Sequence, residues 1–199
     1  MGDGMNERRQ IYETGVIHGR FQIFHNDHLR YILSGKALCK HLVVGITNPD
    51  PFLTRKENAD PTRSDPPENP LTYYERYIMV QKVLLDANLD FHCVSIVPFP
   101  INFPELYQYY LPTDAVFFLS IYDDWGRRKL HYFQSLNLAI HVLREVNIER
   151  KGISAGDIRQ RMITDQPWEH LVPACLPPLI HAWGIPERLK KLRSAFRHK

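Results

Sequence analysis

Two histidines near the start of the chain stand three residues apart, in the stretch His25-Asn26-Asp27-His28. Residues three positions apart share one face of a helix, so both imidazole rings can point toward one ligand. The backbone amides and the dipole of a helix start attract anions, and imidazoles add donors there. The pair predicts a site that binds phosphate and stabilises developing negative charge. Taken alone, a capping histidine beside a packed one explains it equally well.

A serine and an arginine late in the chain predict a second phosphate-binding helix start. Ser154 stands at an expected helix N-terminus, and Arg159 follows about one turn later. A hydroxyl, free backbone amides and a planar guanidinium all bind phosphate oxygens. An ordinary capped surface helix shows the same pattern, but two such helix starts in one small domain favour a bound polyphosphate.

Buried strands are expected to hold these helix starts in place. Residues 15–19 form an apolar segment that ends in a glycine turn, and residues 28–33 have helical spacing. Residues 42–46 are apolar and β-branched, so a parallel βαβ unit is the simplest topology. Further strands are predicted at residues 91–97 and 114–119.

The remaining segments complete an α/β domain. Thr72 and Glu75 have capping-box spacing at the start of a helix expected to reach about residue 85. The last strand is predicted near residues 138–142, directly after the fourth, and the next helix at residues 154–162.

The expected order of elements is β-α-β-α-β-β-α, with a helical tail from Pro173. This order fits an α/β, Rossmann-like doubly wound parallel sheet with a helical C-terminal tail, whose ligands bind beyond the carboxyl ends of the strands. We divide the chain into an N-terminal extension, residues 1–14, and a single domain, residues 15–199.

Composition limits the partners of this domain. The 199 residues are 44% hydrophobic, enough for one core, and the net charge of +3 is spread among interleaved acids and bases. This favours an anionic small molecule over nucleic acid. Cys39, Cys93 and Cys175 lack metal-ligand spacing and are expected to be reduced. The sequence shows no secretory signal or membrane span, so we expect a cytoplasmic protein, and a homo-oligomer is compatible with it.

These motifs together resemble a known family. Residues 19–22 followed by His25 and His28, with Ser154 and Arg159 near the end, are similar to the HxGH nucleotidyltransferase superfamily, and specifically to archaeal-type nicotinamide mononucleotide (NMN) adenylyltransferases. The resemblance implies a Rossmann-like fold, a nucleoside triphosphate carrying Mg²⁺, and release of pyrophosphate. The likeness extends to residues 69–72, Glu75, Arg76, residues 161–162 and residues 168–173.

The resemblance also implies roles for individual residues. His25 and His28 match the motif histidines that bind the triphosphate and stabilise the transition state, and Arg159 is expected to be catalytic with them. Tyr107 takes the place of a tryptophan that stacks on nicotinamide. The expected nucleotide-binding residues are His18, Gly19, Arg20, Phe21, Asp27, Ser154, Gly156 and Arg159, and the expected acceptor-binding residues are Asn48, Arg55 and Tyr107.

Several positions depart from the family pattern. Asp27 replaces the motif glycine, Ile23 a proline and Gly156 a threonine, and residues 120–124 replace a small-Gly-Asn turn. These departures leave the phosphate chemistry better defined than the substrates. ATP with NMN follows from the likeness. A CTP-dependent cytidylyltransferase acting on a small phosphonate is the alternative, and a non-catalytic nucleotide sensor is an alternative of another class.

The expected reaction needs few protein groups. A phosphate or phosphonate oxygen of the acceptor attacks the α-phosphorus in line, and this anion needs no general base. Mg²⁺ is expected to arrive on the phosphates without protein ligands, and Asp123 and Asp124 are interpreted as a surface turn. Arg55, Lys56 and Arg63 lie in a long polar loop that either closes over the site or stays solvated. The basic segment 188–199 is interpreted as helix C-terminal charge, with RNA binding as the alternative.

Overall fold

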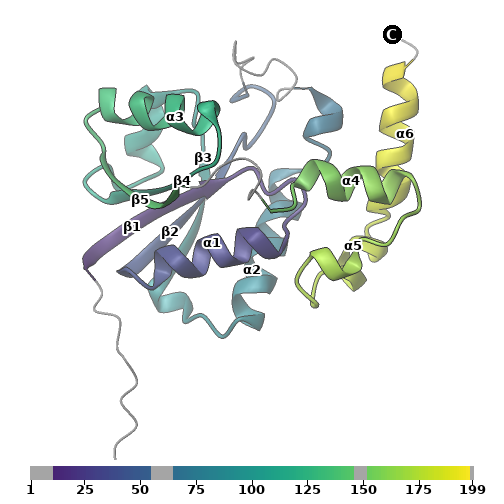
Figure 1. Ribbon diagram of the computed structural model, residues 1–199, viewed down its shortest axis with the longest axis horizontal. Coiled ribbons are helices and arrows are strands. Elements are labelled where there is room, and N and C mark those ends of the chain that lie inside the picture. The colour runs from purple at the N-terminus through teal and green to yellow at the C-terminus, as the bar shows by residue number, and fades with distance from the viewer. Residues whose placement is uncertain (1–10, 55–64, 146–151, 198–199) are drawn as a thin grey trace, which may run out of the picture.

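Five parallel strands form one sheet in the computed structural model, which describes residues 11–54, 65–145 and 152–197 (Figure 1). Their order is β3-β2-β1-β4-β5, so the first strand lies at the centre. This arrangement confirms the predicted Rossmann-like sheet. The strands are β1 (Tyr12–Gly19), β2 (Cys39–Thr47), β3 (Val94–Phe99), β4 (Val116–Ile121) and β5 (Ala139–Glu145).

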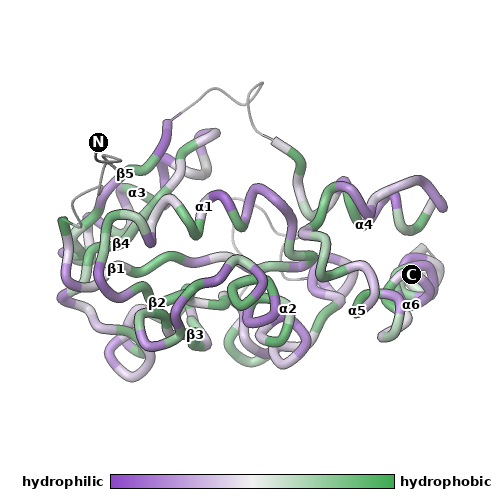
Figure 2. Tube along the Cα trace, turned by 90° about the horizontal axis from the view of Figure 1, so that it is seen from below, coloured by the Kyte–Doolittle hydropathy of each residue, from purple (hydrophilic) through white to green (hydrophobic). Residues whose placement is uncertain are grey.

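Helices cover both faces of the sheet because successive strand residues point to opposite sides. Ile17 and Phe118 pack against α1, α2 and the C-terminal helices, whereas Val16 and Phe117 pack against Phe133 of α3. Figure 2 shows hydrophobic stretches along the strands and alternating colour along α1 and α4. The helices are α1 (Asn26–Lys36), α2 (Tyr73–Asp86), α3 (Asp124–Ser135), α4 (Ala155–Ile163), α5 (Pro177–Ala182) and α6 (Ile185–Arg197).

The sequence-based prediction was wrong about the segment between β4 and β5. It placed a surface turn at Asp123 and Asp124 and no helix, but α3 begins there, and the Asp123 carboxylate caps it by accepting a hydrogen bond from the Gly126 amide at 2.9 Å. The helix has too few apolar residues to be recognised in the sequence, because its contact with the core is made mainly by Leu130 and Phe133.

Two strand starts also differ from the prediction. β1 begins at Tyr12, where the backbone pairs with Cys39, so three residues before Gly15 already belong to the sheet. β3 begins only at Val94, because the preceding residues form a 3₁₀ turn, η3 (Phe91–Cys93).

The helical C-terminal tail is confirmed. Apolar side chains of α4, α5 and α6 join the same core cluster as α1 and α2, and they include Ile158, Ile180 and Leu189. In the described ranges, no helix has the length and apolar character needed to cross a membrane.

Strand order reverses between β1 and β4, and this reversal determines where a ligand can bind. β1 leads through α1 to β2 on one side, whereas β4 leads through α3 to β5 on the other. The two connections diverge at the carboxyl ends of these neighbouring strands and leave a crevice there, which is the usual ligand position in open α/β sheets.

Candidate active site

A cavity of about 440 Å³ lies at this carboxyl edge. Its wall combines strand ends, the loops that follow them, and the first turns of α1, α3 and α4. Ten of the residues predicted from sequence line it: His18, Gly19, Arg20, Phe21, His25, Asp27, His28, Asn48, Ser154 and Gly156.

The two predicted histidines lie together at the start of α1. His25 is the N-cap residue, and its backbone amide donates to Nδ1 of His28 at 3.3 Å. The rings stack with their centroids 3.6 Å apart. Both histidines line the cavity beside the first backbone amides of α1.

Burial keeps these rings neutral in the free protein. It lowers the pKa of His25 to about 4, with the Asp27 carboxylate partly opposing the effect. Burial, then the neighbouring His25 and Arg20, lowers the pKa of His28 well below its ordinary value. A neutral imidazole can donate one hydrogen bond, and a bound phosphate would favour its protonation.

The loop between β1 and α1 holds these histidines by packing. Phe21 adopts φ 53°, and its ring lies 5.4 Å from Phe24 and 5.0 Å from His28. Gly19 makes room for this ring, since a Cβ there would come within 2.8 Å of it. A bulky residue in the left-handed region is strained, and tight packing of this kind maintains it.

Ser154 acts as the N-cap of α4, as predicted. Its Oγ accepts a hydrogen bond from the Asp157 amide at 3.2 Å and donates to Asp157 Oδ2 at 2.7 Å. Asp157 in turn accepts from the Ser154 amide, which completes a capping box. This cap fixes the first turn of α4, including Gly156, against the cavity.

Arg159 lies behind the cavity wall. It is only 4% exposed, and its guanidinium donates to the carbonyl of Gln22 and to the carboxylate of Glu68. Glu68, at the end of the 3₁₀ turn η2 (Pro66–Glu68), lines the cavity and lies 3.9 Å from Arg20. In the free protein, the guanidinium of Arg159, which was predicted to bind phosphate, is therefore paired with Glu68.

A fully buried arginine, Arg76 of α2, ties together the loops that form the floor of the site. Its guanidinium donates to the carbonyls of Arg20, Thr47 and Asn48, at 3.0, 2.6 and 2.7 Å. Burial lowers its pKa to about 10, so it stays charged at neutral pH. Sequence reasoning assigned it no role, and its place beside the capping glutamate Glu75 was the available signal.

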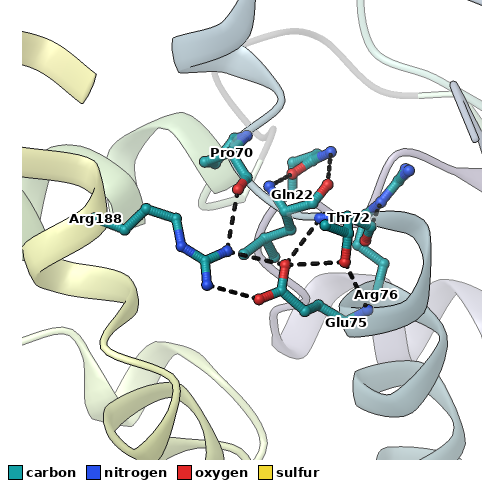
Figure 3. A network of polar contacts seen from close by, with 7 residues as sticks. Gln22, Pro70, Thr72, Glu75, Arg76 and Arg188 are labelled. Carbon is teal, nitrogen blue, oxygen red and sulfur yellow. Dashed lines mark hydrogen bonds and ion pairs between the residues drawn. The ribbon is translucent and has the colours of Figure 1, made fainter. Parts of the chain in front are cut away.

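A polar network supports Arg76 from the side of the C-terminal helix (Figure 3). Glu75 accepts a hydrogen bond from the Thr72 amide at 2.8 Å and pairs with Arg188 of α6 at 2.7 Å. Gln22 exchanges two hydrogen bonds with the backbone of Leu71. The start of α2 is thus bound both to the loop after β1 and to α6.

Comparison with known proteins identifies the family. The sequence matches the cytidylyltransferase-like family over residues 16–161. The chain belongs to this family. It is 47% identical to phosphonoformate cytidylyltransferase from Streptomyces viridochromogenes, over 91% of this chain and 97% of that protein. It is 28% identical to nicotinamide-nucleotide adenylyltransferase from Thermococcus kodakarensis, over 92% of this chain and 89% of that protein.

A solved structure shows the same fold. A bifunctional NMN adenylyltransferase/ADP ribose pyrophosphatase from Francisella tularensis superposes with a TM-score of 0.57 and 17% identity, and the match covers 81% of this chain and 45% of that one. This cytidylyltransferase-like chain is therefore a nucleotidyltransferase with a Rossmann-like fold, and the predicted enzyme class is confirmed. These relatives do not support the alternative of a non-catalytic nucleotide sensor.

Two residues predicted to bind the acceptor of this nucleotidyltransferase need separate comment. Tyr107 does not line the cavity: it is 2% exposed, its ring packs against Phe99 at 4.7 Å, and its hydroxyl donates to the Ile101 carbonyl. The stacking position inferred from the family pattern is thus a core position here. Arg55 lies outside the described residues.

The acidic residues of the cavity wall already have partners. Asp27 pairs with Arg30, and its carboxylate lies against Gly152, where a Cβ would come within 1.9 Å of Oδ2. Glu68 holds Arg159, and Asp123 caps α3. Among the residues that the structure describes, no group of three or more His, Cys, Asp or Glu side chains could hold a metal ion.

Proposed function

We propose that this nucleotidyltransferase transfers a cytidylyl group from CTP to phosphonoformate or a closely similar small phosphonate, with release of pyrophosphate. The likeness to the Streptomyces enzyme carries this proposal, because 47% identity extends over nearly the full length of both chains. The adenylyltransferase relatives match at 28% identity or less. The alternative of a small phosphonate is therefore preferred to ATP with NMN.

The buried position of Tyr107 supports a small acceptor. An acceptor with a nicotinamide ring would need an aromatic stacking surface, and the tyrosine that replaces the family tryptophan is packed between Phe99 and Phe133. Phosphonoformate has no base to stack. The cavity as described offers phosphate-binding helix starts and polar groups, which suit two small anionic reactants.

The transfer itself is a displacement at phosphorus. A phosphonate oxygen forms a bond to the α-phosphorus of CTP while the bond from that phosphorus to its bridging oxygen breaks, and the electron pair leaves with pyrophosphate. The nucleophile is anionic at neutral pH, so no residue need act as a base. His25 and His28 donate hydrogen bonds where negative charge grows, and the start of α4 binds the outer phosphates.

Mg²⁺ fits this site as an ion bound to the phosphates of CTP. The described acidic residues of the wall are paired or capping, so the ion would be held by phosphate oxygens. Bound there, it would neutralise charge on the leaving pyrophosphate. The chain supplies the remaining donors: imidazole N–H groups and helix-start amides.

A pyrophosphate-release assay tests the proposal. CTP, ATP, GTP and UTP are each paired with phosphonoformate, methylphosphonate and NMN in the presence of Mg²⁺. We expect CTP with phosphonoformate to give the highest kcat/KM. Activity confined to ATP with NMN would overturn the proposal and leave the phosphate-binding assignments in place.

Tyr107 gives an independent check of the acceptor. Tyr107→Phe keeps the ring and removes the hydrogen bond to Ile101, so it should leave the KM for phosphonoformate within about twofold of the parent value, as expected for a residue that acts only through packing. Tyr109→Phe, at a side chain that is 73% exposed, is the matched control. A sharp rise in acceptor KM for Tyr107→Phe alone would place Tyr107 at the acceptor after all.

A further inference from the structure

His18, the penultimate residue of β1, has two buried ring nitrogens without a hydrogen-bond partner in the described part of the chain. The side chain is 6% exposed and lies between Phe99 and Phe133, with centroids 5.5 and 5.4 Å away. A buried polar group left unpaired costs about 1–3 kcal/mol, so its position calls for an explanation. His18 lines the cavity, and a ligand there can supply the missing partner.

Lys129 of α3 brings positive charge to the same part of the wall. Both residues line the cavity, and the ammonium is close enough that, after burial, it is the second cause of the lowered His18 pKa. A neutral His18 retains one N–H donor, which can point to an anion while Lys129 supplies the charge.

This part of the wall is separate from the predicted triphosphate site. α3 lies on the left of the molecule in Figure 1 and α4 on the right, and residues of both helices line the cavity. His25, His28, Ser154 and Gly156 come from α1 and α4, whereas Lys129 is contributed by α3 together with Gly126.

The two substrates together require more positive charge than one helix start supplies. CTP carries several negative charges, and phosphonoformate carries a carboxylate besides its phosphonate. Among the described residues that line the cavity, Arg20 and Lys129 are the arginine and lysine side chains. Arg20 lies in the loop between β1 and α1, beside the predicted triphosphate site, whereas Lys129 lies on α3 and acts on His18.

We propose that Lys129 and His18 form the subsite for the anionic group of the acceptor that does not react, the carboxylate in phosphonoformate. This inference rests on the proposed function, and it assigns His18 to the acceptor where family likeness had assigned it to the nucleotide. The ammonium pairs with the carboxylate, the imidazole N–H donates to it, and the phosphonate is turned toward the α-phosphorus of CTP.

A charge-removing variant on α3 tests the subsite. Lys129→Met should raise the KM for phosphonoformate at least about tenfold, the effect expected from losing a charge-assisted hydrogen bond, and leave the KM for CTP nearly unchanged. Lys129→Arg should recover part of the loss. Arg128→Met is the matched control, because Arg128 is exposed on the same helix and does not line the cavity.

Methylphosphonate sharpens the test because it lacks the carboxylate. The parent enzyme should prefer phosphonoformate to methylphosphonate, and Lys129→Met should lose most of that preference while still turning over both. Retention of the full preference in Lys129→Met, or an equal rise in the KM values for CTP and phosphonoformate, would overturn the subsite. The comparison depends on a ratio within one variant, so a partly unfolded sample does not distort it.

The outcome is distinguishable from failure of the proposed function. If the parent proves active with ATP and NMN instead, the proposed function fails, and the inference fails with it, because the phosphate of NMN is the group that reacts. If the parent is active with CTP and phosphonoformate but Lys129→Met keeps the full preference for phosphonoformate, the subsite alone fails. His18→Asn, which keeps a donor but shortens it, should raise the acceptor KM in the same assay more than the CTP KM.

Discussion

Acidification should destabilise the free protein through His25, in an amount set by its pKa. Burial lowers the pKa of this imidazole from 6.5 to about 4, whereas the unfolded chain keeps the ordinary value. Between these values the unfolded chain binds more protons than the folded protein, so the free energy of unfolding falls as the pH falls. Well above pH 6.5 both states are neutral, and the effect vanishes. Full protonation corresponds to about 3 kcal/mol, of which about 2 kcal/mol is lost by about pH 4.5.

Chemical denaturation at about pH 7 and about pH 4.5 measures this loss. Paired carboxylates such as Glu75, whose pKa is lowered in part by Arg188, also weaken the protein in acid, so the parent must be compared with His25→Asn. We expect the parent to lose about 2 kcal/mol more than the variant over this interval. His92→Asn, at an exposed histidine, should behave like the parent.

The comparison has a clear negative outcome. If parent and His25→Asn lose the same free energy of unfolding between the two pH values, His25 is not held neutral by burial. The account of the imidazole as a donor that gains charge on phosphate binding would then fail with it. A lower stability of His25→Asn at both pH values does not affect this difference.

Three further predictions concern the site. His28→Ala should lower the turnover number about a hundredfold and change the KM for CTP little, because its hydrogen bond strengthens as charge develops; unchanged turnover in a folded variant would exclude it from catalysis. Arg159→Lys should weaken CTP binding in titration calorimetry, since lysine cannot hold Glu68 and Gln22 with two nitrogens of one plane; an affinity equal to the parent's would count against this. Arg76→Lys should destabilise the protein by about 3 kcal/mol, because it leaves buried carbonyls unpaired. An unchanged Tm would show that the hydrogen bonds of Arg76 to these carbonyls do not stabilise the loops.

Local patterns predicted the parts of the fold that depend on local physics. The apolar strand segments and the capping pair Thr72 and Glu75 appear where they were expected, because burial periodicity and capping act within a few residues. α3 was missed because its apolar face is narrow and Gly126 lies in its first turn. Alignment to a motif says nothing about which way a side chain faces, so it could not show that Tyr107 lies in the core.

Long-range contacts explain what the sequence could not show in the site. The guanidinium of Arg159 meets Glu68 from 91 positions away in the chain, and Arg76 reaches carbonyls that precede it by 28 to 56 positions. Such contacts leave no periodic signal. Likewise, the sequence shows that His18 is a histidine but not that both of its nitrogens are buried without partners. The roles of the cavity residues remain predictions, although the structure brings ten of them together.

The ion pair between Glu75 and Arg188 has a consequence for the order in which the enzyme matures during synthesis. Every described residue of the cavity wall lies at or before Gly156, so the ribosome has made the whole wall before it adds Arg188. Domains begin to fold while the chain is still emerging. A nascent chain can therefore assemble the sheet and the cavity first, and gain the last support of the α2 start only when α6 docks. Translation that stops before residue 188 would yield a chain with all of its described cavity residues but without the ion pair of Glu75 at the start of the helix that carries Arg76.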